Sequence, residues 1–234
     1  MEIVRIRYKR SILLAMWLLA GMGTVMGQSN AALRDSLAKA TQVLAYHPDS
    51  IDLRLKKAAW NIQLEQWAYA KDELDKVLYL NNTNIAGLFY RAFVNEKMKR
   101  YNFARLDYQN LLVLVPGNFQ AQLGLALLNE KDQHYTEAYD GINSLIEQYP
   151  DSATAYAARG GIEKERGMNE LAEYDYAEAM RRDSTNQDYI VNHLDLLITL
   201  RRKEDALVDL RRLQSLGVNA GQLQEFYARL KKIK

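Results

Sequence analysis

The clearest indication of the fold comes from two consecutive stretches, IAGLFYRAFVNEKMKRYNFARLDYQNLLVLVPGN (residues 85–118) and FQAQLGLALLNEKDQHYTEAYDGINSLIEQYPDS (residues 119–152). Laid one above the other without a gap, they share an alanine, the triplet Asn-Glu-Lys, a tyrosine, a second alanine and a proline, in that order. Self-similarity at a fixed spacing of 34 residues indicates a repeat array.

The same period extends in both directions from this stretch. The three prolines of the chain, Pro48, Pro116 and Pro150, lie on one phase of it, and alanine falls on another phase five times in succession. That row is Ala70, Ala104, Ala138, Ala172 and Ala206. No insertion or deletion is needed from residue 51 to residue 220, which predicts five full repeats.

Each repeat reads as two helices. An alanine followed by apolar residues at +4 and +7 marks one face of a helix, and a proline 12 residues after the alanine position ends that helix. The +4 row is Leu74, Tyr108, Ile142, Tyr176 and Leu210. We predict first helices near 51–64, 85–98, 119–132, 153–166 and 187–200, second helices near 68–80, 102–115, 136–149, 170–182 and 204–216, a lone helix over 32–46 and a closing helix over 223–232.

These residues resemble the tetratricopeptide repeat family. Small residues stand twelve positions before the alanine row at Ala58, Ala92, Ala126 and Gly160, with Leu194 departing, and an aromatic residue precedes that row at Trp67, Tyr101 and Tyr135. The resemblance implies an all-α, right-handed α-solenoid of antiparallel helix pairs. It divides the chain into a half repeat (28–50), five units (51–84, 85–118, 119–152, 153–186 and 187–220) and a C-terminal capping helix (221–234).

Composition excludes several kinds of chemistry. The 234 residues contain no cysteine and only three histidines, so disulfides, thiolate metal sites and a cysteine nucleophile are absent. No phosphate-binding loop or serine elbow occurs. We therefore expect no enzymatic activity, no cofactor and no metal. The alternative from another class is an envelope hydrolase that uses carboxylates in the groove of the solenoid.

Residues 1–27 have the pattern of a secretory signal peptide. Four bases between Arg5 and Arg10 precede an apolar core from Ile12 to Ala20 and a small-residue stretch that ends at Gly27. Cleavage after Gly27 predicts an exported protein, periplasmic or secreted. As a separate expectation, we take the source to be a Gram-negative bacterium. The alternative is an uncleaved helix that tethers a scaffold to the membrane.

The leader also carries most of the positive charge. Without its four bases and one acid, the net charge changes from +2 to about −1. A chain without a basic stripe is not expected to bind nucleic acid, and after cleavage no membrane contact is expected. The expected partner is a protein or peptide, and the oligomeric state stays open.

One position of the first helices is basic in four of the five repeats, and an acid follows sixteen residues later in the same four. In the third repeat leucine (Leu125) replaces the base and glycine (Gly141) replaces the acid. Since paired charge is how buried charge is usually tolerated, we predict structural bridges between the paired helices, rather than an anion site. The predicted pairs are Lys57 with Glu73, Arg91 with Asp107, Arg159 with Asp175, and His193 with Asp209.

By the resemblance, certain positions of the first helices line the concave side of the solenoid. In the first three repeats they form an apolar stripe with a mixed-charge rim, which suits a peptide or protein segment. The candidate binding residues are Leu55, Phe89, Phe93, Glu96, Lys97, Leu123, Leu127, Glu130 and Lys131. The alternative is that the apolar positions pack against the adjacent helix. Asparagine recurs at one further position (Asn61, Asn95, Asn129), which we interpret as a ladder of side-chain amides bonding adjacent helices.

Overall fold

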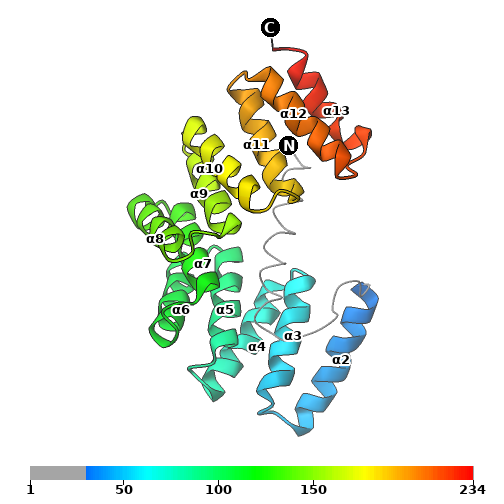
Figure 1. Ribbon diagram of the computed structural model, residues 1–234. Coiled ribbons are helices and arrows are strands. Elements are labelled where there is room, and N and C mark those ends of the chain that lie inside the picture. Colours follow the sequence, from blue (N-terminus) through cyan, green and yellow to red (C-terminus); the bar gives the residue numbers. More distant parts are fainter. Residues whose placement is uncertain (1–29, 234) are drawn as a thin grey trace. The chain divides into compact units, whose positions relative to one another are not determined.

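A computed structural model of the chain describes residues 30–233, and within that range every regular element is an α-helix (Figure 1). The signal peptide predicted for residues 1–27 lies outside the described residues. The twelve helices of the described range, labelled as in Figure 1, are α2 (Asn30–Tyr46), α3 (Ile51–Gln63), α4 (Trp67–Leu80), α5 (Ile85–Lys97), α6 (Tyr101–Leu114), α7 (Phe119–Lys131), α8 (Tyr135–Gln148), α9 (Ala153–Glu165), α10 (Asn169–Arg182), α11 (Gln187–Thr199), α12 (Lys203–Ser215) and α13 (Ala220–Leu230).

The helices fall where the 34-residue period predicts them. The five first helices begin at the predicted residue, and each second helix begins one residue earlier than predicted. The two end helices deviate more, because α2 begins two residues early and α13 begins three residues early. The all-α fold class is confirmed.

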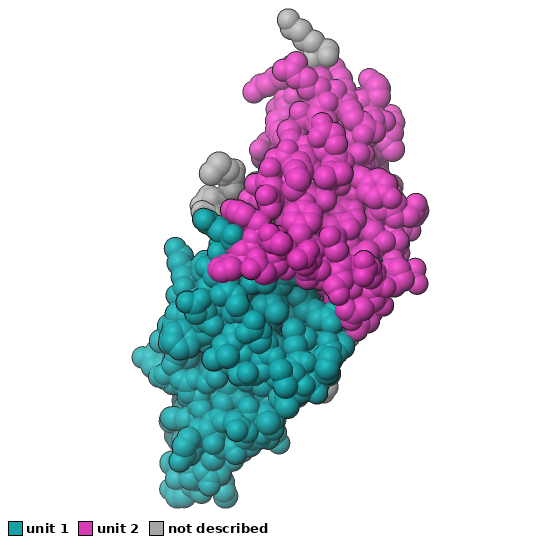
Figure 2. All heavy atoms as spheres, turned by 90° about the vertical axis from the view of Figure 1, so that its left-hand side faces the viewer, with its two compact units in different colours: residues 1–133 teal, residues 134–234 magenta. Residues whose placement is uncertain are grey.

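The chain divides into two compact units, residues 1–133 and 134–234 (Figure 2). In the first unit α3 packs on α4 and α5 on α6, while α4 contacts α5 and α6 contacts α7. In the second unit α9 packs on α10 and α11 on α12, while α10 contacts α11, and α13 contacts both α11 and α12. Within each unit, every helix pair is therefore stacked on its neighbours in sequence.

The first helices of four repeats begin with a side-chain cap. A side-chain oxygen accepts a hydrogen bond from a backbone N–H of the first turn and so satisfies a donor that has no partner inside the helix. The capping residues lie 34 residues apart: Asn84, Asn118, Ser152 and Asn186.

The turn inside each pair is built differently. Its central residue has positive φ in every repeat, and only one of these five residues is glycine. The next residue's N–H reaches back to a carbonyl near the end of the first helix, as in Arg100 N to Asn95 O at 2.8 Å. This is the pattern of a Schellman turn, in which a left-handed residue ends the helix. The five residues are Glu65, Lys99, Gln133, Gly167 and Arg201.

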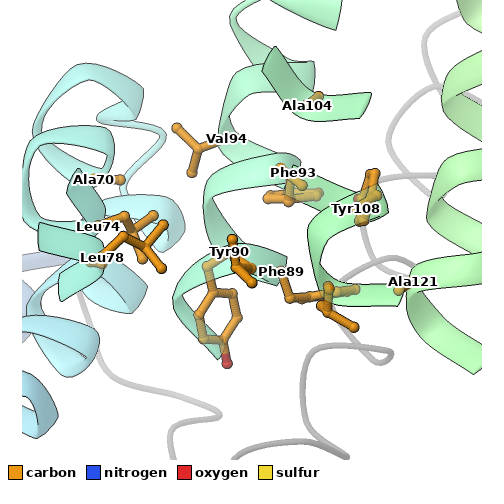
Figure 3. Packing of buried hydrophobic residues seen from close by; sticks show 14 of the residues in the cluster. Ala70, Leu74, Leu78, Phe89, Tyr90, Phe93, Val94, Ala104, Tyr108 and Ala121 are labelled. Atoms are coloured by element: carbon orange, nitrogen blue, oxygen red, sulfur yellow. The ribbon is translucent and has the colours of Figure 1, made fainter. Parts of the chain in front are cut away.

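The alanine row lies in the core. All five alanines have an exposed fraction of 0%, and the row four residues later is almost equally buried. Small residues are required where helices come closest: a Cβ added at Gly160 would lie 3.2 Å from the carbonyl oxygen of Ala172. Figure 3 shows the first unit's part of this core, where Phe89 of α5 and Tyr108 of α6 meet edge to face with ring centroids 6.0 Å apart.

Candidate functional site

The five apolar residues of the predicted binding stripe divide into two groups. Phe89, Phe93 and Leu123 are 6%, 7% and 8% exposed, so they belong to the packed interior. Leu55 and Leu127 are half-buried. For the first three, the structure supports the packing alternative, because their side chains are buried and cannot serve as open anchors for a ligand.

The contacts of Phe93 illustrate this packing. Its ring meets the Trp67 ring edge to face at 6.2 Å, and the Lys97 ammonium lies 4.9 Å from its centroid. Trp67 is the first residue of α4, so its ring and that of Phe93 connect the first repeat to the second. We call these two rings the aromatic floor of this surface. A cation over an aromatic face adds a modest attraction. What the surface presents to solvent here is a charged side chain above an aromatic floor.

The charged rim is itself paired across neighbouring first helices. Lys131 of α7 forms an ion pair with Glu96 of α5. The second unit has a counterpart on α9 and α11, where Lys164 Nζ lies 2.6 Å from Asp195 Oδ2. Glu130 is half-buried on the same first-unit helix as Lys131. The first helices therefore carry charges of both signs that bridge one repeat to the next.

All four predicted base–acid pairs are in contact in the structure. Two are bidentate: Arg91 meets Asp107 at 2.7 and 2.9 Å, and Arg159 meets Asp175 at 2.6 and 2.8 Å. The acid side chains are only 2% exposed in both pairs. The other two contacts are Lys57 Nζ to Glu73 Oε1 at 2.9 Å and His193 Nδ1 to Asp209 Oδ2 at 2.6 Å.

Sequence reasoning missed a second partner of these bases, which lies on the second helix of the preceding repeat. Arg91 Nη1 bonds Asp75 Oδ1 at 2.9 Å, and Arg159 Nη1 bonds Asn143 Oδ1 at 2.9 Å. Both partners stand sixteen residues before the arginine. The chemical types at this position differ between repeats, so the only signal was the spacing itself. Each arginine therefore joins three helices.

The first and fifth repeats reach a similar arrangement with other residues. Glu73 receives Arg54 at 2.7 Å in addition to Lys57. Burial alone would raise the pKa of Glu73, but the hydrogen bonds from Lys57 and Arg54 outweigh it and lower that pKa. His193 lies between Asp209 and Glu173 of the preceding second helix, with Nε2 3.1 Å from Glu173 Oε1.

The recurring asparagines are buried, but they do not form the expected ladder of amides. Asn95 Nδ2 donates to Asp107 Oδ2 at 3.4 Å, and Asn129 Oδ1 accepts from Arg105 Nε at 3.1 Å. The predicted ladder of side-chain amides is therefore wrong for Asn95 and Asn129. Their amides bond to charged side chains, which are stronger partners than a second amide.

Metal-binding geometry is not found in residues 30–233, where no three His, Asp or Glu side chains gather as an ion would require. In the same range no helix combines the length and apolarity needed to cross a bilayer.

Comparison with known proteins shows which fold these stacked helix pairs share. No family model matches the chain. A tetratricopeptide repeat protein from Parabacteroides merdae superposes with a TM-score of 0.71 at 21% identity, covering 86% of this chain and 79% of that one. YrrB, described as a tetratricopeptide repeat protein with an unusual peptide-binding site, superposes with a TM-score of 0.51 at 16% identity, covering 76% of this chain and 91% of its own.

A curated relative, human sperm-associated antigen 1, is 26% identical over 104 residues, which are 43% of this chain. The match covers 11% of that protein, so this chain spans only a small part of its length. Together with the stacked helix pairs, the structural likenesses show that the chain is a helical repeat protein with the tetratricopeptide repeat fold.

Proposed function

We propose that the chain is a non-enzymatic scaffold of the cell envelope that binds a protein or peptide segment along the first helices of its first unit. The observation that carries the proposal is the surface of α5 and α7, where Glu96, Lys97 and Lys131 lie above a packed aromatic floor. Stacked helix pairs offer such surfaces as extended binding faces. The half-buried Leu127 supplies the apolar contact, since Phe89 and Phe93 are occupied in the core.

Charged groups of a segment bound on this face form ion pairs with Lys131 and Glu96, in place of the ion pair between these two residues. The pair is partly exposed on the lysine side, at 35%, so a ligand carboxylate can compete with Glu96 for the ammonium group. A rim of mixed charge sets the direction and register of the ligand more than its affinity.

Site-specific photo-crosslinking in living cells tests the binding face. A photoreactive amino acid at position 127 should give a discrete crosslinked product, and charge reversal of Lys97 and Lys131 together should abolish that product. The matched control is position 113 of α6, whose valine is 80% exposed on a second helix. Equal products from positions 113 and 127, or a product that survives charge reversal, would reject this face.

The envelope location is a separate part of the proposal and rests on the pattern of residues 1–27. Fractionation followed by N-terminal sequencing tests it. A soluble periplasmic or secreted chain that begins at Gln28 supports export with cleavage, and a membrane-bound chain that retains its leader supports the tethered alternative. A chain that stays in the cytoplasm contradicts both.

A further inference from the structure

The second and fourth repeats contain the same buried charge cluster with one chemical exchange. In both, an arginine on the first helix bonds an aspartate on its own second helix and a side chain on the preceding second helix. An amide and a carboxyl have exchanged places between the two clusters. The members, in matching order, are Arg91, Asp107, Asp75 and Asn95 in the second repeat, and Arg159, Asp175, Asn143 and Glu163 in the fourth.

The exchange places a carboxyl where the other repeat has a donor. Asn95 donates its Nδ2 hydrogen to Asp107. Glu163 occupies the corresponding position in the fourth repeat, close enough to Asp175 for the charge of that carboxylate to act on it. Two ionised carboxylates have no hydrogen to share, and Arg159 already binds both oxygens of Asp175, so a hydrogen bond at this position requires a proton on Glu163. A protonated Glu163 then does for Asp175 what the amide of Asn95 does for Asp107.

The surroundings of Glu163 favour this proton. Counted over the whole residue, Glu163 is 5% exposed and Asp175 is 1% exposed. Arg159 of the same helix is already occupied by both oxygens of Asp175 and by Asn143 of α8. The Glu163 oxygen Oε2 is buried and has no hydrogen-bond partner among the described residues.

The remaining groups that face Glu163 are on α8 and α9. Tyr139 of α8 lies close enough to lower the pKa of Glu163, and Arg166 lies over the Tyr139 ring at 5.8 Å. Burial, and after it the charge of Asp175, raises the pKa of Glu163 to about 7, against the lowering effect of Arg159. The ordinary value for a glutamate is 4.5.

We propose that Glu163 forms a pH-sensitive link between helices α9 and α10. When it is protonated it donates to Asp175 and ties α9 to α10; when it ionises, two buried carboxylates repel each other and the pair opens more readily. Because the folded state holds this proton more tightly than an opened state does, the stability of the pair falls as pH rises from about 4.5 through 7.

Amide hydrogen exchange of the full chain at pH 6 and pH 8 tests the proposal. After correction for the intrinsic exchange rate, protection of α9 and α10 amides should fall about tenfold between these values, as a pKa change from 4.5 to about 7 requires. The chain contains its own control, since α5 and α6 carry Asn95 at the same position and should not show this fall.

Two variants assign the effect to one side chain. Glu163→Gln keeps a donor toward Asp175 and cannot ionise, so α9–α10 protection should become equal at the two pH values. Glu165→Gln makes the same change at an exposed position two residues away and should retain the tenfold fall. His193 is also titratable, with a raised pKa, and contacts Glu173 of α10, so the difference between wild type and Glu163→Gln is the measured quantity.

A carboxyl-detected NMR titration gives an independent reading. The Glu163 signal should titrate near pH 7. A Glu163 signal that titrates near 4.5, or a tenfold fall that persists in Glu163→Gln, would overturn the proposal. If Glu163→Gln does not fold, the wild-type titration and the comparison of α9–α10 with α5–α6 still decide it.

Discussion

At the scale of single residues, the repeats show why arginine and lysine are not equivalent at the same position. Arg91 and Arg159 use two nitrogens for one carboxylate and a third for the preceding repeat. Lys57 offers a single ammonium group, and in its repeat Arg54 supplies the second bond to Glu73. The planar guanidinium therefore does in one residue what otherwise takes two.

Removal of one member of such a cluster should be costly. Arg91→Ala leaves the Asp107 carboxylate buried without its main partner, and we expect a loss of about 3 kcal/mol in the free energy of unfolding. Urea unfolding followed by circular dichroism measures it. The double variant Arg91→Leu with Asp107→Ala should recover most of the loss, since the third repeat uses Leu125 with Gly141 in these positions. A double variant no more stable than the single one would contradict this account.

His193 makes the fifth repeat sensitive to pH. Burial alone would lower the pKa of His193, but its contacts with Asp209 and Glu173 outweigh burial and raise that pKa. The protonated form is therefore the stabilising one: its contribution is fully present below the unfolded-state pKa and is lost as pH rises through the folded-state pKa. His193→Gln on the Glu163→Gln background should flatten the remaining dependence of the unfolding free energy between pH 6 and 9, and an unchanged slope would contradict it.

At the scale of elements, the turns between repeats belong to two types. Where proline is present, a side chain bonds its carbonyl: Arg54 bonds Pro48 O at 2.6 Å, Gln122 bonds Pro116 O at 2.8 Å and Arg182 bonds Pro150 O at 2.9 Å. Where proline is absent, an Asn or Asp side chain bonds the residue two positions on, as Asn81 and Asp183 do to Thr83 and Thr185. Both types satisfy backbone groups that the helix ends leave open.

The turns inside the pairs are under conformational strain in four of five repeats, because non-glycine residues adopt positive φ there. Gly167 is the exception, with φ of 72° and open space within 4 Å of the point where a Cβ would lie. Gly167→Ala should therefore cost about 1 kcal/mol of unfolding free energy through backbone conformation alone, as measured by urea unfolding. Gly167→Asn is the matched control and should cost less, because asparagine tolerates this region better. Equal losses in the two variants would point to another cause.

At the scale of the whole molecule, stability is a sum of neighbouring contacts within each unit, as expected for a repeat protein. Among the described residues, a buried apolar cluster lies in the first unit, and separate clusters lie in the second. The last helix closes the second unit: Leu223 and Leu230 of α13 are 1% and 3% exposed within the cluster that contains α11 and α12.

The aspartate Asp195 forms ion pairs that connect the closing helix, α13, to the preceding repeats. Asp195 of α11 accepts from Lys164 of α9 and from Arg229 of α13, each at 2.6 Å. Burial alone would raise the pKa of Asp195, but the two bases outweigh it and lower that pKa. Its contribution is thus present above the unfolded-state pKa and lost as pH falls through the folded-state pKa.

Asp195→Asn should cost about 1 kcal/mol, a value at the low end because Arg229 is about one-third exposed. Hydrogen exchange of α13 should become faster in this variant while α5 and α6 are unaffected. The exposed Asp205→Asn change is the control and should leave α13 protection as it is. Unchanged α13 protection in Asp195→Asn would reject this connection.

Spacing along the chain was enough to predict the bounds of the paired helices to within one residue, the buried alanine row and the four base–acid pairs, because each depends on distances within one repeat. Sixteen residues across a known turn bring Arg91 to Asp107. Three other features became visible only in three dimensions: Phe89 and Phe93 are covered, Arg91 also binds Asp75, and non-glycine residues occupy the left-handed turns. The covered rings and the second bond of Arg91 depend on how one pair stacks on the next, because neighbours from another repeat are not specified by a residue's own local pattern. The left-handed residues depend on the tight turn that ends each first helix.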